Sequence, residues 1–314
     1  MRESRADVLV GAARSGDARS LARLVSLVEN GSPELRPVMR AVAPHTGNAR
    51  VIGLTGSPGV GKSTVTDQLV RAYRAAGLRV SVLAVDPTSP FSGGALLGDR
   101  VRMQDHATDS GVFIRSMASR GHLGGLSWSA PQALHILDAA GFDVICVETV
   151  GVGQAEVEVA GLADTTLVVL APGLGDSIQT AKAGILEIAD VFVVNKSDRP
   201  GANDVSRDLR SMLAMAPDRR GWRPPIVLTA ASAGTGVDEL VARVAEHWEW
   251  LGESGVLRER RVARAREEVS AIAVADIRRR LGGLPGESRL DELAELVATG
   301  KLDPYSAADD LLAG

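Results

Sequence analysis

Short apolar runs alternate with helical stretches between residues 51 and 246. The runs are rich in Val and Ile, are nearly continuous, and are each followed by a turn. Seven of them are candidate strands: Val51–Thr55, Val80–Val85, Val112–Arg115, Val144–Val147, Thr166–Leu170, Val191–Val194 and Ile226–Leu228. Continuous apolar strands are typical of a parallel sheet that helices cover on both faces. The pattern therefore predicts an α/β fold with a mostly parallel central sheet.

Both ends of the chain are predicted to be helical. Apolar residues recur at helical spacing over Ala6–Asn30, and Gly31-Ser32-Pro33 ends this helix before a short connector to the first strand. Beyond Trp250 no strand pattern remains, and Arg258–Leu281 and Ser288–Thr299 are predicted helices. We expect an N-terminal helical extension, a central α/β domain and a C-terminal helical arm, over residues 1–46, 47–250 and 251–314.

Composition narrows the class of protein only slightly. Charged residues make up 24% and the formal net charge is −4, which argues against a dominant nucleic-acid-binding surface. No apolar run reaches about 18 residues, and no signal-peptide pattern follows Met1–Asp7. We therefore expect no membrane span and a cytoplasmic location. The single cysteine, Cys146, lies between apolar residues and is predicted to be a buried, inert thiol in a reducing compartment.

The strongest motif of the chain is a phosphate-binding loop. It reads Gly56-Ser57-Pro58-Gly59-Val60-Gly61-Lys62-Ser63, followed by Thr64, and fits the pattern G-x-x-x-x-G-K-S/T between a predicted strand and a predicted helix. Glycines let backbone N–H groups close around phosphate oxygens, and the helix N-terminus adds positive potential. Lys62 is expected to face the β- and γ-phosphates, and Ser63 to offer its hydroxyl to magnesium. This context favours nucleotide binding over a chance glycine-rich turn.

A second motif predicts which base is bound. Asn195-Lys196-Ser197-Asp198 follows the predicted strand Val191–Val194 directly. Asp198 is expected to accept hydrogen bonds from the ring N–H and the exocyclic amine of guanine, whereas adenine presents the wrong donors. A site built around such a polar group discriminates by roughly 10⁴–10⁵. Lys196 is expected along the base plane, and Asn195 to join this loop to the phosphate-binding loop. An isolated motif of this kind is also compatible with a simple turn, but its context favours GTP.

Acidic residues that end two predicted strands are candidate magnesium ligands. Glu148 follows Val144–Val147, where a second acidic residue is expected in a phosphate-binding-loop site. Glu148-Thr149-Val150-Gly151 takes the place of the more usual D-x-x-G, and Gly151 is positioned to offer its backbone N–H to the γ-phosphate. Asp86 directly follows Val80–Val85 and is the other candidate ligand. The alternative role for Asp86 is that of a turn residue before Pro87.

The stretch Pro87–Asp105 is rich in Gly, Ser and Pro and contains Asp99 and Arg102. We interpret it as a switch loop that orders around the γ-phosphate and the metal. Its composition alone is equally compatible with an ordinary surface loop.

Three blocks of sequence are specific enough to indicate a family. They are Val85–Phe91 with Gly93–Arg100, Ile114–Ala118 with Arg120–Gly125, and Glu148–Gln154. In these blocks the chain closely resembles the MeaB/ArgK GTPases, a family in the G3E group of P-loop GTPases, and the resemblance covers nearly the whole chain. It implies a homodimeric GTPase that escorts adenosylcobalamin-dependent methylmalonyl-CoA mutase, protects it and gates the loading of its cofactor. The C-terminal arm would then be a dimerisation arm.

The resemblance also implies roles for single residues. Ser63, Asp86, Asp99 and Glu148 would surround magnesium during the GTPase cycle, and Arg102 would belong to switch I. Lys182, in Gly173–Gly184, would lie in a switch that couples hydrolysis to the mutase. One departure is visible where guanine-binding loops often carry Ser-Ala, because this chain has Ala230 and Ala231. A backbone N–H contact to the base oxygen would survive that change.

Two other functions are compatible with the group of GTPases as a whole. A nickel metallochaperone would be expected to carry His-rich tracts or Cys-containing metal sites. The five histidines of this chain are instead scattered, and we expect them in loops or on the surface: His45, His106, His122, His135 and His247. An ATP-using transport kinase is opposed by Asn195–Asp198. The basic stretch Arg258–Arg266 is expected to be a solvated, ion-paired helix face.

Overall fold

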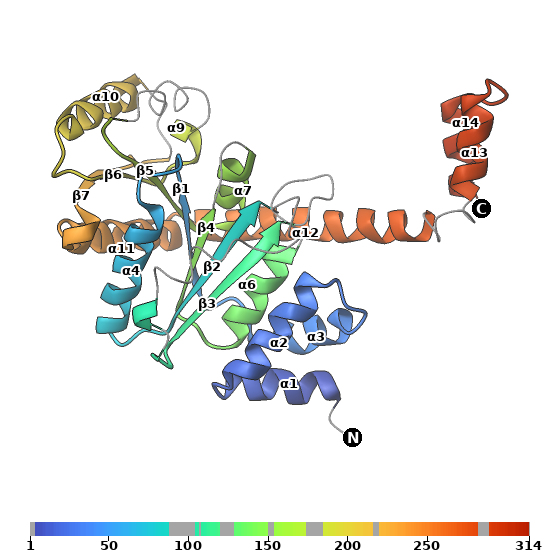
Figure 1. The fold of residues 1–314 in the computed structure, drawn as a ribbon, viewed down its shortest axis with the longest axis horizontal. Coiled ribbons are helices and arrows are strands. Elements are labelled where there is room, and N and C mark those ends of the chain that lie inside the picture. Colours follow the sequence, from blue (N-terminus) through green and yellow to red (C-terminus); the bar gives the residue numbers. More distant parts are fainter. Residues whose placement is uncertain are drawn as a thin grey trace. The chain divides into compact units, whose positions relative to one another are not determined.

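The computed structural model describes residues 4–87, 104–106, 108–119, 129–149, 154–173, 185–215, 220–281 and 289–313. The chain forms two compact units, one over residues 1–261 and the other over residues 262–314 (Figure 1). The first unit contains the whole sheet, and the second is helical.

The first unit is built on a seven-stranded parallel sheet in the order β3-β2-β4-β1-β5-β6-β7 (Figure 1). The strands are β1 Arg50–Thr55, β2 Val80–Pro87, β3 Val112–Ser119, β4 Val144–Thr149, β5 Thr165–Leu170, β6 Val191–Asn195 and β7 Ile226–Thr229. The predicted α/β fold with a mostly parallel sheet is therefore confirmed. Every predicted apolar run is part of a strand.

Several strands extend past the apolar runs at their carboxyl ends. In β2 the paired residues continue to Pro87, and in β4 they include Glu148, which lies beside Leu54 of β1. Backbone pairing depends on the register of neighbouring strands and not on side-chain polarity, so a polar residue can continue a ladder that an apolar run begins. The extension places polar residues at one edge of the sheet.

Helices cover both faces of the sheet, which explains why the strands carry apolar residues on both faces. Even-numbered residues of β4, such as Val144 and Cys146, pack with α4 (Lys62–Ala75) and α11 (Val237–Glu253). Odd-numbered residues, such as Ile145 and Val147, pack with α6 (Ser129–Ala139) and α7 (Gln154–Leu162). Since successive strand residues point to opposite faces, both sets are buried. The short helix α9 (Ile185–Ile188) and α10 (Ala202–Met215) pack near β6 and β7.

The N-terminal segment differs from its prediction. The expected single helix is two helices, α1 (Arg5–Arg14) and α2 (Ala18–Glu29), and the expected connector contains α3 (Leu35–Val42) and a short 3₁₀ turn. The break lies at Gly16, whose φ of +93° is a left-handed conformation that glycine adopts without steric cost. Asp17 then caps α2, because its side chain accepts a hydrogen bond from the backbone N–H of Ser20 at 3.0 Å.

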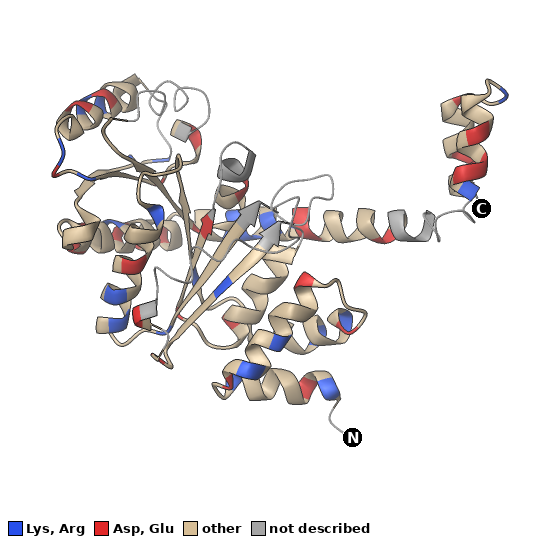
Figure 2. Cartoon of the chain, viewed as in Figure 1, with Lys and Arg blue, Asp and Glu red and all other residues tan. Residues whose placement is uncertain are grey.

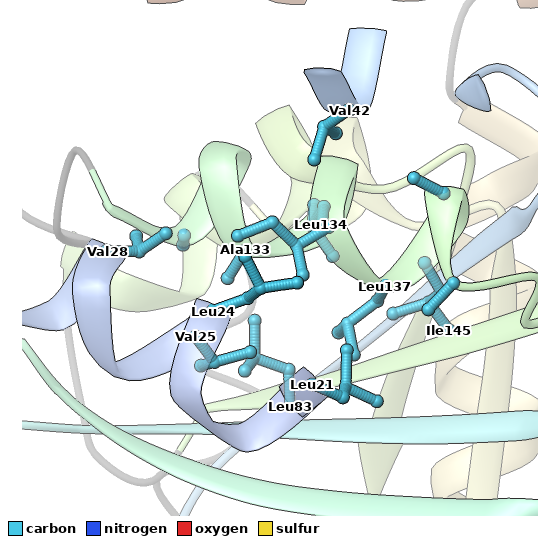
Figure 3. Packing of buried hydrophobic residues seen from close by; sticks show 14 of the residues in the cluster. Leu21, Leu24, Val25, Val28, Val42, Leu83, Ala133, Leu134, Leu137 and Ile145 are labelled. Atoms are coloured by element: carbon cyan, nitrogen blue, oxygen red, sulfur yellow. The ribbon is translucent and has the colours of Figure 1, made fainter. Parts of the chain in front are cut away.

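These N-terminal helices extend the core of the first unit. Buried residues on α2, including Leu21, Leu24 and Val28, pack against α6 residues such as Leu134 and Leu137 (Figure 3). Burial of one such side chain contributes about 1.5–3 kcal/mol. The N-terminal helices therefore pack on α6 and share its hydrophobic core.

Three helices occupy the C-terminal end of the chain: α12 (Val256–Leu281), α13 (Arg289–Ala298) and α14 (Pro304–Ala313). The first two match predicted helices, whereas α14 was not predicted. Positive and negative residues are mixed along the helices of the protein, while the strands are almost free of charge (Figure 2). Among the described residues, no helix has both the length and the apolar character that crossing a membrane requires.

Candidate nucleotide-binding site

The loop after β1 adopts a conformation that requires its glycines. Gly56, Gly59 and Gly61 have φ angles of +138°, +81° and +96°. A Cβ atom on Gly56 would overlap the carbonyl oxygen of Val169 in β5, and one on Gly61 would overlap the side-chain amide of Asn195. Close packing and left-handed backbone both exclude larger residues at these two positions. The loop therefore holds its shape through contacts with its neighbours on the sheet.

Lys62 and the start of α4 give this loop its positive charge. The Nζ atom of Lys62 donates to the carbonyl oxygens of Gly56 at 2.6 Å and Ser57 at 3.3 Å, so the ammonium group lies inside the loop. Gly61 is the N-cap of α4 and has no side chain to satisfy the first backbone N–H groups of the helix. Such N–H groups, together with the helix dipole, form a site for a phosphate.

A carboxylate from β4 lies against the first turn of α4. Even-numbered residues of β4 face α4, and Glu148 is the last of them in the strand. The hydroxyl of Ser63 donates to Oε1 of Glu148 at 2.5 Å, and the hydroxyl of Thr66 lies 3.1 Å from Oε2. Glu148 is only 2% exposed. The structure therefore brings Ser63 and Glu148 together, although 84 residues separate them in sequence.

These oxygen atoms fit a magnesium ion. Mg²⁺ prefers hard oxygen ligands and usually retains several waters, so a hydroxyl and a carboxylate at the phosphate loop are a suitable partial set. Within the part of the chain that the structure describes, no group of three or more His, Cys, Asp or Glu residues gathers as a metal cluster. The backbone of Asp86 lies next to the end of β2 and pairs with Ala118 of β3, while its side chain lies outside what is described.

Asn195 joins the loop after β1 to the loop after β7. Its Nδ2 donates to the carbonyl oxygen of Val60 at 2.8 Å, and its Oδ1 accepts from the Thr229 hydroxyl and the Ala231 backbone N–H, both at 3.1 Å. Asn195 is 3% exposed, so water cannot replace these partners. The side chain therefore links the phosphate loop, the end of β6 and the loop after β7.

The neighbouring residues complete this arrangement. Lys196 has a φ of +58°, and its Nζ donates to the carbonyl oxygen of Gly59 at 2.5 Å. Asp198, two residues further, is exposed in the same loop. The backbone N–H groups of Ala230 and Ala231 donate to Thr235 and Asn195, each at 3.1 Å. To bind the oxygen of guanine, either N–H group would have to donate to two acceptors at once or give up its present acceptor.

The predicted site residues thus divide into two groups. Those of the phosphate loop, Glu148, the Asn195–Asp198 motif and the Ala230–Ala231 pair lie along the carboxyl edge of the sheet. Four others lie outside the described residues: Asp99, Arg102, Gly151 and Lys182. The side chain of Asp86 also lies outside them. Thr66, which contacts Glu148, was missed by the sequence reasoning. Its position one helical turn beyond Lys62 is the signal that could have indicated it.

Comparison with known proteins gives a family whose described activity suits this site. Residues 21–283 match the family described as "Methylmalonyl Co-A mutase-associated GTPase MeaB". The chain belongs to the MeaB family of GTPases. The family resemblance that the sequence motifs indicated is therefore confirmed.

Relatives of this MeaB-family chain are named as GTPases. A protein of Pyrococcus abyssi named as a GTPase is 49% identical over 98% of this chain and 95% of its own length. The GTPase ArgK of Escherichia coli is 37% identical over 78% of this chain and 77% of its own. The crystal structure of a protein called LAO/AO transport system kinase superposes with a TM-score of 0.73 at 27% identity, over 100% of this chain and 98% of that one.

The MeaB-family chain is accordingly a GTPase that binds GTP and GDP and converts GTP to GDP and phosphate. In this reaction a water oxygen forms a bond to the γ-phosphorus, and the bond from that phosphorus to the bridging oxygen breaks. Negative charge on the phosphoryl oxygens is stabilised by positive groups and by N–H donors. At the phosphate loop the structure places one positive group, the ammonium of Lys62, and the N–H donors at the N-terminus of α4.

Several residues away from the nucleotide differ from their predictions. The histidines were expected in loops or on the surface, yet His106 and His247 are buried at 8% and 0% exposure. The basic stretch Arg258–Arg266 was expected to be a solvated, ion-paired helix face. Arg260 and Arg261 are indeed ion-paired, but their partners are the buried carboxylates of Asp190 and Asp164. These acceptors could not be predicted from local pattern, because they lie about 70 and 97 residues away in the chain.

Cys146 has the buried position that was predicted for it. It is 0% exposed in β4, and burial, with a smaller contribution from the charge of Glu148, raises its thiol pKa to about 12. The thiol therefore stays protonated at neutral pH and is a poor nucleophile.

Proposed function

We propose that this GTPase is a chaperone of an adenosylcobalamin-dependent acyl-CoA mutase of the methylmalonyl-CoA type, protecting it and gating the loading of its cofactor. The observation that carries the proposal is the match of residues 21–283 to a family described as mutase-associated. The single buried cysteine, Cys146, suits a reducing compartment such as the cytoplasm. No nucleic acid or membrane partner is part of the proposal.

The proposed site assigns a role to each group of residues. Residues of the phosphate loop, together with Thr64 in the first turn of α4, bind the β- and γ-phosphates. The guanine base is selected by Asn195, Lys196 and Asp198, with the backbone amides of Ala230 and Ala231. Ser63, Asp86, Asp99 and Glu148 would hold magnesium, which would supply positive charge to the phosphate oxygens. The Ser63–Glu148 hydrogen bond of 2.5 Å supports this assignment because it places two of these ligands side by side. Gly151 would offer its backbone N–H to the γ-phosphate, and Arg102 would belong to switch I.

We also propose that the protein is a homodimer, with the helices of residues 251–314 as its dimerisation arm beside an extension over 1–46 and a GTPase domain over 47–250. Apolar residues on α12 that lie more than a third exposed support this proposal: Val262, Val269, Ile272, Val274 and Ile277. Exposed apolar rows of this kind usually mark an interaction surface. Sedimentation of the full chain and of a Val269→Glu, Ile277→Glu variant tests it, and a monomeric wild type would refute it.

The mutase partnership is tested by single-turnover GTP hydrolysis with and without a purified methylmalonyl-CoA mutase. Stimulation is the expected result, and the proposed coupling residue is Lys182. Lys182→Ala should keep GTP and GDP binding and lose most of the stimulation, which in other GTPases amounts to about 10³–10⁵ when a well-placed positive charge is supplied. Lys301→Ala, on an exposed turn, is the matched control. Unchanged turnover in the presence of the mutase would refute the chaperone proposal.

A further inference from the structure

We infer that Thr66 is a positioning residue for Glu148, and that its hydroxyl holds the carboxylate in the orientation that presents Oε1 to Ser63 and to the metal. Thr66 lies on the turn of α4 that follows Ser63. Its side chain is completely buried, and its Oγ1 lies 3.1 Å from Oε2 of Glu148. The inference rests on the proposed magnesium role of Glu148.

The two oxygens of Glu148 have different partners. Oε1 accepts from Ser63 at 2.5 Å, and Oε2 lies beside the Thr66 hydroxyl. The terminal torsion of a glutamate is broad, so nothing in the side chain itself fixes the plane of the carboxylate. A hydrogen bond at each of its two oxygens does fix that plane. Glu148 is only 2% exposed, so water cannot replace the hydroxyl of Thr66 as its hydrogen-bond donor.

The hydroxyl of Thr66 has a second acceptor, the carbonyl oxygen of Lys62 at 3.0 Å. That carbonyl lies one turn back in α4 and receives a backbone N–H within the helix, so it does not depend on the hydroxyl. A carboxylate is the stronger acceptor, because a hydrogen bond to an ionised group is roughly twice as strong as a neutral one. The Thr66 hydroxyl therefore donates its hydrogen bond mainly to Glu148. The β-branch of threonine also restricts χ1, which keeps the hydroxyl at this place.

The test is a magnesium titration of GDP binding, followed by the fluorescence of a methylanthraniloyl-labelled GDP. Thr66→Val removes the hydroxyl and keeps the shape of the side chain. Loss of a hydrogen-bond partner of a metal ligand lowers metal affinity by about 10–100-fold. We expect the magnesium concentration at half-effect to rise by about that factor, and GDP affinity in EDTA to stay as in wild type.

Three further variants separate positioning from damage to the fold. Thr66→Ser restores the hydroxyl and should return the midpoint to within about threefold of wild type. Thr55→Val alters a fully buried threonine at the end of β1 whose hydroxyl has no hydrogen-bond partner among the described residues, and should not change the midpoint. In a Glu148→Gln background, Thr66→Val should add almost nothing, because its target is already altered.

The outcomes distinguish this inference from the magnesium site itself. A Thr66→Val midpoint equal to that of wild type, with Glu148→Gln impaired, overturns the role of Thr66 alone. GDP binding that ignores magnesium in the wild type, or a Glu148→Gln variant that behaves as wild type, overturns the metal role of Glu148 and the inference together. If Thr66→Val does not fold, the comparison of Thr66→Ala with Thr66→Ser decides the same question.

Discussion

Arg260 of α12 binds both carboxylate oxygens of Asp190, with Nη2–Oδ1 at 2.8 Å and Nη1–Oδ2 at 2.9 Å. Asp190 is 2% exposed and directly precedes β6, whose last residue is Asn195. The ring of His247 lies 3.4 Å from the same carboxylate. The beginning of α12 is thus held by an ion pair to the residue that precedes β6, the strand that ends at Asn195.

Stability should fall at acid pH because of Asp190. Burial opposes its ionisation and is the largest influence, but the hydrogen bonds from Arg260 and the nearby ring of His247 together outweigh it and lower the pKa from 3.8 to about 2. A carboxylate with a lowered pKa contributes stability above its unfolded pKa and loses it as pH falls toward the folded pKa. The contribution, on the order of 2 kcal/mol, should therefore disappear between about pH 4 and pH 2.

Urea unfolding of wild type and Asp190→Asn at several pH values measures this effect. The variant should be less stable at pH 7, by roughly 3–5 kcal/mol, because it leaves Arg260 without its charged partner. Its stability should also fall less than that of wild type below pH 4. Asp204→Asn breaks an exposed ion pair with Arg207 and serves as the control. Parallel acid losses in wild type and Asp190→Asn would contradict the prediction.

Asp198→Asn should change the base that is bound. The carboxylate accepts from guanine, whereas an amide can donate to the second oxygen of xanthine, so the variant should lose GDP affinity and gain affinity for XDP. Because Asp198 is exposed, its replacement should leave the thermal midpoint nearly unchanged. Competition binding with GDP, XDP and ADP measures the shift. Equal binding of ATP and GTP by the wild type would refute the guanine assignment.

Lys62→Ala should weaken binding of GTP and GDP. A hydrogen bond to a charged group contributes about 1.5–3 kcal/mol, so affinity should fall by about 10–150-fold and hydrolysis should be lost. Calorimetric titration with GDP and a phosphate-release assay test this. The matched control is again Lys301→Ala, in the second unit. Wild-type turnover in Lys62→Ala would place the active site away from the phosphate loop.

Asn195→Ala should lower both stability and nucleotide affinity. It leaves the carbonyl of Val60, the hydroxyl of Thr229 and the N–H of Ala231 without their present partner, and each unsatisfied buried group costs about 1–3 kcal/mol. Thermal unfolding with and without GDP separates the two effects. Asn48→Ala, at an exposed position before β1, should change neither. An unaltered Asn195→Ala protein would mean that the two loops are held together by other contacts.

Much of the fold could be predicted from local pattern. All seven apolar runs are strands, since burial on both faces leaves a continuous apolar signature, and the spacing from Gly56 to Ser63 indicated the phosphate loop before any contact was visible. Helix boundaries were less predictable. The split at Gly16 depends on one residue in a left-handed conformation, which helical periodicity on either side conceals.

The sequence by itself determined which residue types stand at the ends of the strands, and therefore that the protein binds phosphate and guanine. Only the tertiary structure decided which of them meet. The sheet order places β4 beside β1, which brings Glu148 to Ser63 and Thr66, and it places Asp190 within reach of His247 and Arg260. Local periodicity reports the environment of each segment, whereas the pairing of segments depends on contacts between residues far apart in the chain.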